Sequence, residues 1–445
     1  MKIIESKDFD AYWKNIPRQV DDPKTEKTVK KVIADVRKNG DAAVKKYASR
    51  WDKSSPAMLE VSFSQAIKAL DDLRVNDASL VSALELAALN IKTFSVKQRE
   101  QFSDFETEIN KGIITGQKII PVEQAGVYIP GGRFPLFSSV LMCVIPAFCA
   151  GVNEVILSSP PAADGLPDKK ILAAAIIAAN VCGIKENALR IFAIGGAQAI
   201  AALAIGTESV PRVDVIAGPG NRFIAAAKKQ LFGEVGIDFI AGPSDILLIA
   251  DGSTQTSIEK AAQIAAADMI GQAEHDPDAR ARALVPSKEF AQKIAECIKN
   301  RLNELSENNR KTARASLDAG GLIIIYKDLE DIIRISNKIA PEHLELQTSN
   351  DDSIIPKLKN FGSLFIGSKS AEVLGDYSAG VNHTLPTETC ARFTGGLSVR
   401  HFLKTVTTLR CTDGEGFEKA RNAAEIIGRA EGLEAHAQSA AIRKE

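Results

Sequence analysis

Histidine is scarce in this 445-residue chain, and four of its five histidines lie in short clusters of acidic, glycine-rich or otherwise polar sequence. These four are His275, His343, His383 and His436, whereas His401 lies outside such a cluster. Imidazole titrates near neutral pH and is also a common metal ligand, so the clusters are suited to proton transfer or metal binding. We therefore expect the chemistry of the protein to involve them.

The first cluster is Gln-Ala-Glu-His at 272–275, which is expected to end a helix whose N-cap is Thr256. Residues three positions apart share one helix face, so Gln272 and His275 can point at one target. Histidine is a good zinc ligand, whereas a glutamine carbonyl is an unusual one. A histidine at a helix end can also interact with the terminal carbonyls, so this motif alone does not identify a metal site.

The second cluster is Pro-Glu-His-Leu at 341–344, between a predicted helix at 331–339 and a strand-like run. Glu342 and His343 supply a carboxylate and a group that titrates near neutrality, which are the two tools of proton transfer. The alternative is an ordinary surface pair, but the apolar residues on both sides favour a functional one.

The third cluster, residues 375–387, contains Asp376, His383, an asparagine and two glycines. Little in this stretch could build a core, so its role is expected to be conformational or chemical.

The fourth cluster is the C-terminal segment, where Glu431 and His436 lie on a predicted helix. We expect a histidine near the chain terminus to have a function only if it acts together with residues of the other clusters. A zinc site built from Gln272, His275, Asp376 and His436 would offer two nitrogen and two oxygen ligands and leave room for a substrate.

The segments that must position these residues change in character along the chain. Residues 25 to 105 carry apolar residues at helical spacing, whereas the sequence after about residue 119 alternates short apolar runs with Ala-rich stretches. The apolar runs predict buried strands at 126–129, 155–157, 190–194, 213–217 and 246–250. Buried strands that alternate with helices imply parallel pairing, so the predicted fold class is α/β.

Three of these strands end in glycine-rich turns, at 130–132, 195–198 and 218–221. A glycine-rich turn between a strand and a helix exposes backbone amides that bind phosphate well. None of the turns has the Gly-x-Gly-x-x-Gly pattern, and glycines also serve simply to make tight turns. Three such turns at the carboxyl ends of neighbouring strands nevertheless favour a ligand crevice.

The composition gives no reason to expect nucleic acid or a membrane as a partner, because 55 Lys and Arg nearly cancel 56 Asp and Glu. The N-terminal sequence is charged, without the apolar stretch of a secretory signal, and no apolar run reaches the roughly 20 residues of a spanning helix. The six cysteines form no Cys-x-x-Cys pair, as expected for reduced thiols. We therefore expect a cytoplasmic protein.

The motifs occur together, and in the same order, in the histidinol dehydrogenase family, which the chain resembles from about residue 20 to 443. The matching segments are Tyr-Ile-Pro-Gly-Gly at 128–132, Gly-Gly-Ala-Gln-Ala-Ile at 195–200, Gly-Pro-Gly-Asn at 218–221, Gly-Ile-Asp at 236–238, Ala-Gly-Pro-Ser at 241–244, Gln-Ala-Glu-His-Asp at 272–276, Pro-Glu-His-Leu at 341–344, Gly-Asp-Tyr at 375–377, Asn-His at 382–383 and Glu-Gly-Leu at 431–433. So many matches in one order are far more specific than any single one. A departure is Asp245, where glutamate is commoner in the family.

The resemblance implies two Rossmann-like parallel-sheet domains with helical N-terminal and C-terminal extensions, assembled as a domain-swapped homodimer. The implied parts are an N-terminal extension at 1–20, a discontinuous α/β domain of 21–124 with 249–395, an NAD-binding α/β domain at 125–248, and a helical tail at 396–445 that reaches the partner subunit. The discontinuous domain would carry the metal and acid–base motifs.

The resemblance also implies a role for each matched residue. One zinc ion per subunit would be held by Gln272, His275, Asp376 and His436. The acid–base pair would be Glu342 and His343, and NAD would contact Tyr128, Gln198 and Asn221. The substrate would contact the zinc ligands and His343, together with Ser244, His383 and Glu431. In the homodimer, Glu431 and His436 would complete the active site of the other subunit.

The implied reaction is the oxidation of L-histidinol through L-histidinaldehyde to L-histidine with two NAD reduced, the last step of histidine biosynthesis. His343 would take the hydroxyl proton, and Glu342 would activate the water that hydrates the aldehyde. None of the six cysteines lies in a motif beside a candidate base, which favours hydration over a route through a cysteine adduct.

Three other functions are compatible with parts of the sequence. A related zinc- and NAD-dependent dehydrogenase would act on another small polar alcohol, such as a sulfonated one, and Thr-Gly-Gly-Leu at 394–397 resembles such relatives. A zinc hydrolase also combines a metal with a glutamate base, but no His-Glu-x-x-His helix is present. A nucleotide-binding module without catalysis would leave Glu342 and His343 without a role.

Overall fold

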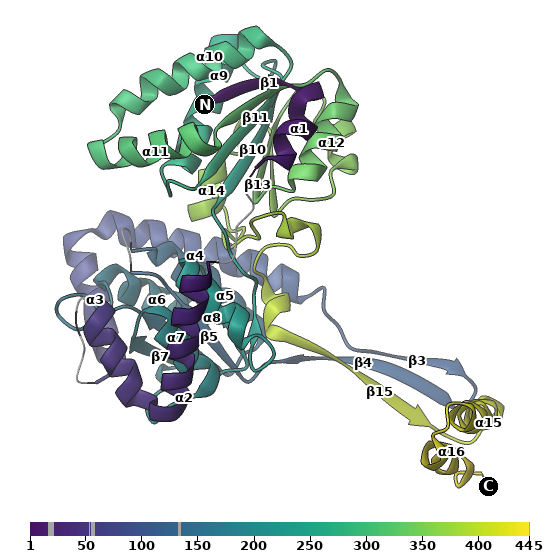
Figure 1. Ribbon diagram of the computed structural model, residues 1–445. Coiled ribbons are helices and arrows are strands. Elements are labelled where there is room, and N and C mark those ends of the chain that lie inside the picture. Colours follow the sequence, from purple (N-terminus) through teal and green to yellow (C-terminus); the bar gives the residue numbers. More distant parts are fainter. Residues whose placement is uncertain (17–21, 53, 55–57, 132–134, 445) are drawn as a thin grey trace.

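The computed structural model describes residues 1–16, 22–52, 54, 58–131 and 135–444, so Gly132 of the first glycine-rich turn lies outside the described residues. Three sheets organise the described chain (Figure 1). Sheets A and B have six strands each and are covered by helices, whereas a three-stranded arm sheet extends away from both. The prediction of an α/β fold with parallel sheets is confirmed.

Sheet A is parallel throughout, with the strand order β1-β12-β11-β10-β13-β14. Its inner strand β10 is buried along its whole length, and alternate side chains enter two cores: Ile246 and Leu248 enter one, Leu247 and Ile249 the other. The strands are β1 (Lys2–Glu5), β10 (Asp245–Ala250), β11 (Arg280–Val285), β12 (Leu322–Ile325), β13 (His343–Gln347) and β14 (Ser363–Ile366). The helices are α1 (Phe9–Lys14), α9 (Ile258–Ala273), α10 (Lys288–Arg301), α11 (Glu307–Gly320), α12 (Leu329–Ile339), α13 (Asp351–Ile354) and α14 (Glu372–Tyr377).

Sheet B has the order β2-β7-β6-β5-β8-β9 and is parallel except for the edge pair β2 and β7. Its strands are β2 (Glu60–Val61), β5 (Gln124–Tyr128), β6 (Glu154–Ser159), β7 (Leu189–Ala193), β8 (Val215–Ala217) and β9 (Gly236–Ile237). Its helices are α2 (Pro23–Trp51), α3 (Phe63–Asn76), α4 (Ala78–Arg99), α5 (Phe137–Ala150), α6 (Lys169–Cys182), α7 (Gly196–Ile205) and α8 (Arg222–Leu231). Among the described residues, α4 is long and apolar enough to cross a membrane. This is weak evidence for a membrane span, because the core helices of soluble proteins can have the same length and composition.

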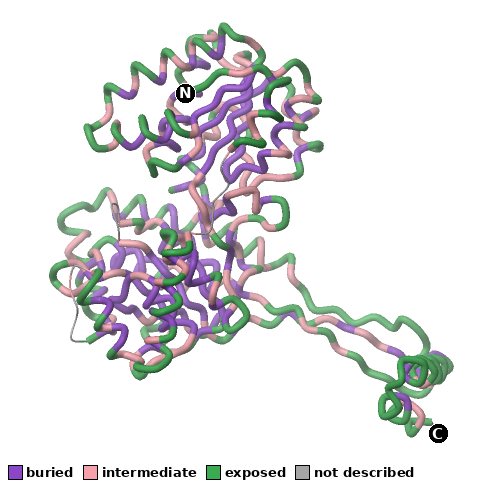
Figure 2. Tube along the Cα trace, viewed as in Figure 1, coloured by how far each residue is buried: buried purple, intermediate pink, exposed green. Residues whose placement is uncertain are grey.

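The arm combines the antiparallel strands β3 (Phe105–Asn110), β4 (Ile113–Pro121) and β15 (Leu403–Cys411) with the terminal helices α15 (Glu415–Ala430) and α16 (Glu434–Ala441). β15 pairs with β4 from Leu403 opposite Pro121 to Cys411 opposite Ile113. Figure 2 shows that much of the arm is exposed, in contrast to the buried interiors of the two larger sheets.

The expected division of the chain is corrected in three places. The described part of the expected extension at 1–20 is not separate, because β1 is the edge strand of sheet A. Residues 21–124 do not join 249–395, because α2, α3 and α4 pack against α7, α6 and α5 of sheet B. The tail at 396–445 is not wholly helical, because β15 is a strand of the arm sheet. Periodicity indicates that a segment has an apolar face but not which sheet that face covers.

One helix start is also corrected. The N-cap of α9 is Ser257, whose side chain accepts a hydrogen bond from the backbone amide of Lys260, rather than Thr256. Serine and threonine are both good N-caps, so two adjacent hydroxyl residues leave the boundary open by one position.

Candidate functional site

The candidate site is a cavity of about 190 Å³ where the amino ends of sheet A strands face the carboxyl ends of sheet B strands. Ser244 precedes β10, and Glu342 and His343 stand at the start of β13. From the other side, Pro219 and Gly220 follow β8. The cavity is therefore built by both sheets.

The cavity collects most of the residues that the sequence singled out. The predicted residues that line it are Ser244, Gln272, His275, Glu342, His343, Asp376 and His383. Glu431 and His436 do not join them, because both are exposed at the helical end of the arm, far from the cavity in the same chain (Figure 1). Within one chain the expected four-residue metal set is therefore incomplete.

Three of the lining residues form a cluster suited to a metal ion. Ligand atoms of His275, Glu372 and Asp376 all lie within 4.8 Å of one another. Gln272 lines the same cavity, and its buried Oε1 has no hydrogen-bond partner among the described residues. Imidazole nitrogen, carboxylate oxygen and an unpaired amide oxygen are donors that a zinc ion accepts.

Glu372 was not predicted from the sequence. It lies four residues before Asp376 on α14, so both carboxylates are on one helix face. This spacing is the signal that would have found it.

His343 lies between three acidic side chains in the buried part of the cavity. Its Nδ1 is 3.4 Å from Glu372 Oε1 and 3.9 Å from Glu342 Oε2, and its Nε2 is 3.6 Å from Asp376 Oδ1. Burial alone would lower the pKa of His343, but these three carboxylates raise it well above its usual value. The site therefore stabilises the protonated form of this imidazole.

Glu342 is fixed by a reciprocal pair of hydrogen bonds with Asp245. The amide of Asp245 donates to Glu342 Oε2 at 3.0 Å, and the amide of Glu342 donates to Asp245 Oδ1 at 3.1 Å. The buried guanidinium of Arg282 donates to Asp245 Oδ2 at 2.9 Å. Burial raises the pKa of Glu342 to about 7, with a smaller opposing effect from His343. A carboxyl group that titrates near neutrality is suited to act as a general acid or base.

His383 uses both ring nitrogens within the protein. Its Nδ1 is 2.7 Å from the backbone oxygen of Asp376, and because a carbonyl only accepts, Nδ1 carries the proton. Its Nε2 then accepts from Ser139 Oγ at 2.8 Å. Burial lowers the pKa of His383, which favours this neutral form. Ser139 comes from α5, far away in the sequence, and no local pattern pointed to it.

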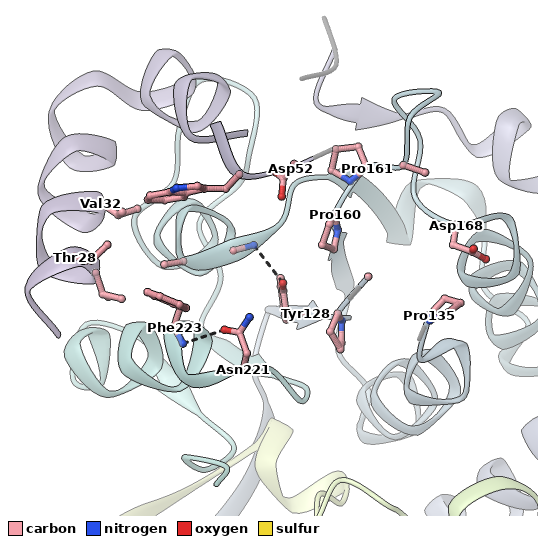
Figure 3. A pocket seen from close by; sticks show the side chains of 17 residues that line it. Thr28, Val32, Asp52, Tyr128, Pro135, Pro160, Pro161, Asp168, Asn221 and Phe223 are labelled. Carbon is pink, nitrogen blue, oxygen red and sulfur yellow. Dashed lines mark hydrogen bonds between the residues drawn. The ribbon is translucent and has the colours of Figure 1, made fainter. Parts of the chain in front are cut away.

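A larger cavity of about 830 Å³ lies at the carboxyl ends of the sheet B strands (Figure 3). Tyr128 and Asn221, two predicted NAD contacts, line it. Tyr128 accepts a hydrogen bond from the amide of Gly196 at 3.2 Å, and Asn221 caps α8. Gln198, the third predicted contact, is fully buried beside this cavity and reaches Asp52, which lines it.

The two cavities are neighbours that share two short segments of chain. Pro135 and Asn221 line the larger cavity, whereas the adjoining residues Leu136, Pro219 and Gly220 line the smaller one. A molecule as long as a dinucleotide can therefore occupy the larger cavity and extend one end toward the smaller.

A buried ion pair holds the shared turn at 218–221 from behind. Lys228 Nζ donates to the oxygen of Gly218 at 2.6 Å and to Asp238 Oδ1 at 2.7 Å. The amide of Gly218 donates to Asp238 Oδ2 at 2.9 Å. These contacts determine where the turn lies between the cavities.

Comparisons with known proteins agree over nearly the whole chain. A sequence profile described as histidinol dehydrogenase matches residues 16–444. The histidinol dehydrogenase of Aquifex aeolicus is 43% identical over 421 residues, covering 94% of this chain and 92% of that protein. The one from Thermus thermophilus is 41% identical over 423 residues, covering 95% of each. The crystal structure of histidinol dehydrogenase from Elizabethkingia anophelis matches with a TM-score of 0.88 at 33% identity, covering 99% of this chain and 97% of that one. The chain therefore belongs to the histidinol dehydrogenase family and is an oxidoreductase.

Proposed function

We propose that the chain oxidises L-histidinol through L-histidinaldehyde to L-histidine, the last step of histidine biosynthesis. L-histidinol, two NAD⁺ and one water would give L-histidine, two NADH and three protons. The observation that carries the proposal is one cavity that combines the cluster of His275, Glu372 and Asp376 with Glu342 and His343. The larger cavity beside it has the size and position for NAD.

Zinc fits the donor set of the smaller cavity, with one ion per subunit. Gln272, His275 and Asp376 would hold it, and Glu372 is a further carboxylate within reach. The unpaired Oε1 of Gln272 supports this, because a buried acceptor without a partner is costly unless something binds it. When bound, zinc supplies a Lewis acid that anchors an amino alcohol through its lone pairs.

His343 acts in the alcohol oxidation by accepting the hydroxyl proton. The carboxylates of Glu342, Glu372 and Asp376 stabilise the imidazolium that this transfer produces. Nδ1 lies near Glu372, so that contact holds a proton there. With zinc held by His275 and Asp376, the negative charge beside the ring would be offset and the pKa of the ring lowered, which would leave Nε2 free to accept the new proton. Ser244 and His383 line the same cavity and would contact the substrate.

Glu342 acts in the second oxidation by taking a proton from the water that adds to the aldehyde. Its pKa of about 7 makes it a base that is partly ionised at neutral pH. No cysteine is among the described residues that line the cavity. Cys143 touches the lining residue Thr384 at 3.9 Å, but burial raises its pKa to about 12, so it remains an unreactive thiol. Direct hydration is therefore preferred over a cysteine adduct.

A homodimer with shared active sites would complete the metal and substrate contacts. His436 and Glu431 lie at the end of an exposed arm, which is the position from which a segment can reach a second subunit. His436 would supply the remaining zinc ligand, and Glu431 would contact the imidazole of the substrate. Mixing inactive His275→Asn and His436→Asn proteins tests this, because heterodimers recover activity only if one site takes ligands from both chains.

One assay separates this function from its alternatives. Purified protein is given zinc, NAD and L-histidinol, and NADH and product are followed together. Two NADH for each histidine formed support the proposal. Turnover of another polar alcohol but not histidinol would indicate a related dehydrogenase, and hydrolysis without NADH would indicate a zinc hydrolase. NAD binding without turnover of any alcohol would indicate a binding module.

A cytoplasmic location is also part of the proposal. It is supported by the six cysteines, all of which are free thiols. Fractionation of cells that produce the protein tests it, because recovery in the membrane or exported fraction would contradict the assignment.

A further inference from the structure

Asp52 is an acidic residue of the larger cavity to which no role has yet been given. It follows Trp51, the last residue of α2, and its side chain enters the cavity above Tyr128 in Figure 3. Gln198 Nε2 donates to Asp52 Oδ2 at 3.4 Å. A Cβ on Gly195 would lie 2.6 Å from Asp52 Oδ1, so a glycine at this position makes room for the carboxylate.

The surroundings of Asp52 favour neutral hydrogen-bond donors as its partners. The charged residues among the described lining are Asp52 and Asp168, and no described lysine or arginine lines the cavity. Burial raises the pKa of Asp52 to about 6, against the hydrogen bonds from Gly195 and Gln198. At neutral pH Asp52 is therefore an ionised, half-desolvated carboxylate that a second anion would destabilise.

The two cavities together decide which end of a dinucleotide meets Asp52. The nicotinamide must reach the smaller cavity, which adjoins the larger one at Pro135 and Asn221. None of the described residues that line the smaller cavity comes from α2 or α7, the elements that hold Asp52. The part of the dinucleotide near Asp52 is therefore the adenosine end.

We propose that Asp52 accepts hydrogen bonds from the ribose hydroxyls of the adenosine and thereby selects NAD over NADP. A carboxylate receives two vicinal hydroxyl donors well, and the same carboxylate repels the 2′-phosphate of NADP. The proposal rests on the proposed function only in taking the larger cavity as the NAD site.

A purely local role for Asp52 makes a different prediction. In that case its carboxylate would only join the end of α2 to the start of α7 through Gly195 and Gln198. Asp52→Asn keeps an acceptor oxygen of the same shape and removes the charge. The variant therefore separates selection of the cofactor from local structure.

The test measures binding as well as turnover. Trp51 lines the cavity and is one of two tryptophans, so its fluorescence reports titration with NAD and with NADP. We expect Asp52→Asn to lower the ratio of the Kd for NADP to the Kd for NAD at least tenfold, about the effect of one hydrogen bond to a charged group. The ratio of kcat/KM values with histidinol should change in the same direction. Each ratio compares the values for NADP and NAD measured on the same protein preparation. A misfolded fraction affects both values equally and therefore cancels.

Asp168→Asn is the matched control. Asp168 lines the same cavity, but its carboxylate accepts from the amide of Lys170 as the N-cap of α6, a task that asparagine also performs. Its binding ratio should stay within about threefold of the original protein, because its charge is engaged elsewhere. An equal shift in both variants, or a shift of less than about threefold in Asp52→Asn, would overturn the proposal.

Asp52→Glu keeps the test decisive if the asparagine variant folds poorly. It retains the charge and displaces it by one methylene, so NADP should still be rejected while NAD binds more weakly. Improved NADP binding in this variant would also overturn the proposal. If the original protein binds NAD selectively but does not oxidise histidinol, the proposed function fails while the role of Asp52 stands.

Discussion

The two cavities use the edges of their sheets in opposite ways. The larger one lies at the carboxyl ends of the sheet B strands, where Tyr128 ends β5 and Asn221 follows β8. Ligands of parallel sheets usually bind at this edge. The smaller one takes its acid–base groups from the amino edge of sheet A, where Glu342 and His343 begin β13.

Under the proposed function, this difference would separate cofactor recognition from chemistry. At the edge of sheet A, buried carboxylates and imidazoles shift each other's pKa values, as at Glu342, His343 and Glu372. At the edge of sheet B, Gly-rich turns and capping side chains such as Asn221 determine the shape of the larger cavity. Substitutions in the smaller cavity should therefore lower kcat, whereas those in the larger cavity should change cofactor binding.

The largest effect is expected at His343. His343→Asn should lower kcat by about 10²- to 10⁴-fold, the usual contribution of a general base. Zinc content should stay unchanged in this variant, whereas His275→Asn should lose the metal. Steady-state NADH formation and metal analysis of both proteins check this. Full activity in both variants would contradict the site assignment.

A large effect on stability is expected behind the turn shared by the two cavities. Lys228→Met leaves Asp238 buried without its cation and should lower the free energy of unfolding by about 3–5 kcal/mol. The control is Arg37→Ala, because the side chains of Arg37 and Glu234 are 48% and 49% exposed and such pairs contribute up to about 1 kcal/mol. Urea unfolding compares the two. Equal losses would mean that the turn does not depend on the buried pair.

The pH dependence should report Glu342. If Glu342 is the base, its ionised form is required, so the aldehyde oxidation should slow as the pH falls through about 7, approaching tenfold per pH unit below it. Asp245 raises the pKa of Glu342, so Asp245→Asn should move this acid limb to lower pH. The pH profile of the aldehyde step measures it. An acid limb that stays in place or moves upward would exclude Glu342 as the base.

The smallest effect is expected at Tyr128. Tyr128→Phe removes the acceptor of the Gly196 amide and should raise the KM for NAD by about two- to tenfold, the contribution of one neutral hydrogen bond. The kcat value should hardly change. A fall in kcat at constant KM would contradict the division between the two cavities, because a residue of the larger cavity would then take part in the chemical step.

The sequence predicted which residues lie together in the smaller cavity better than it predicted how the helices pack. The clusters at 272–275 and 341–344 converge because each adjoins a helix or strand whose pattern was clear. The cluster at 375–387 joins them through α14, which no clear sequence pattern predicted. The partners of the helices before residue 100 were predicted wrongly, because an apolar helix face fits either sheet. β15 was expected to be helical, although its alternating, partly exposed strand pairs with β4 across nearly three hundred residues.

The residues that were missed differ in how visible they are in the sequence. Glu372 shares a helix face with Asp376, so helical spacing alone would have identified it. Ser139 meets His383 only through the docking of α5 against the loop after α14, and nothing local predicts that contact. Arg282 is a fully buried cation in a strand, and it is explained by Asp245 on the neighbouring strand and by the ring of Trp13, over which its guanidinium lies.

The turn at 218–221 touches both cavities, and this has a thermodynamic consequence. If binding in one cavity shifts this turn, the affinity of the other changes by some factor, and the reverse effect must have the same factor. Cofactor and substrate would then be coupled through the protein in addition to their direct contact. Lys228 and Asp238, which hold Gly218 from behind, would set the size of that coupling. Weakening the ion pair between Lys228 and Asp238 would make the binding of cofactor and substrate more independent, even if each ligand keeps its contacts within its own cavity.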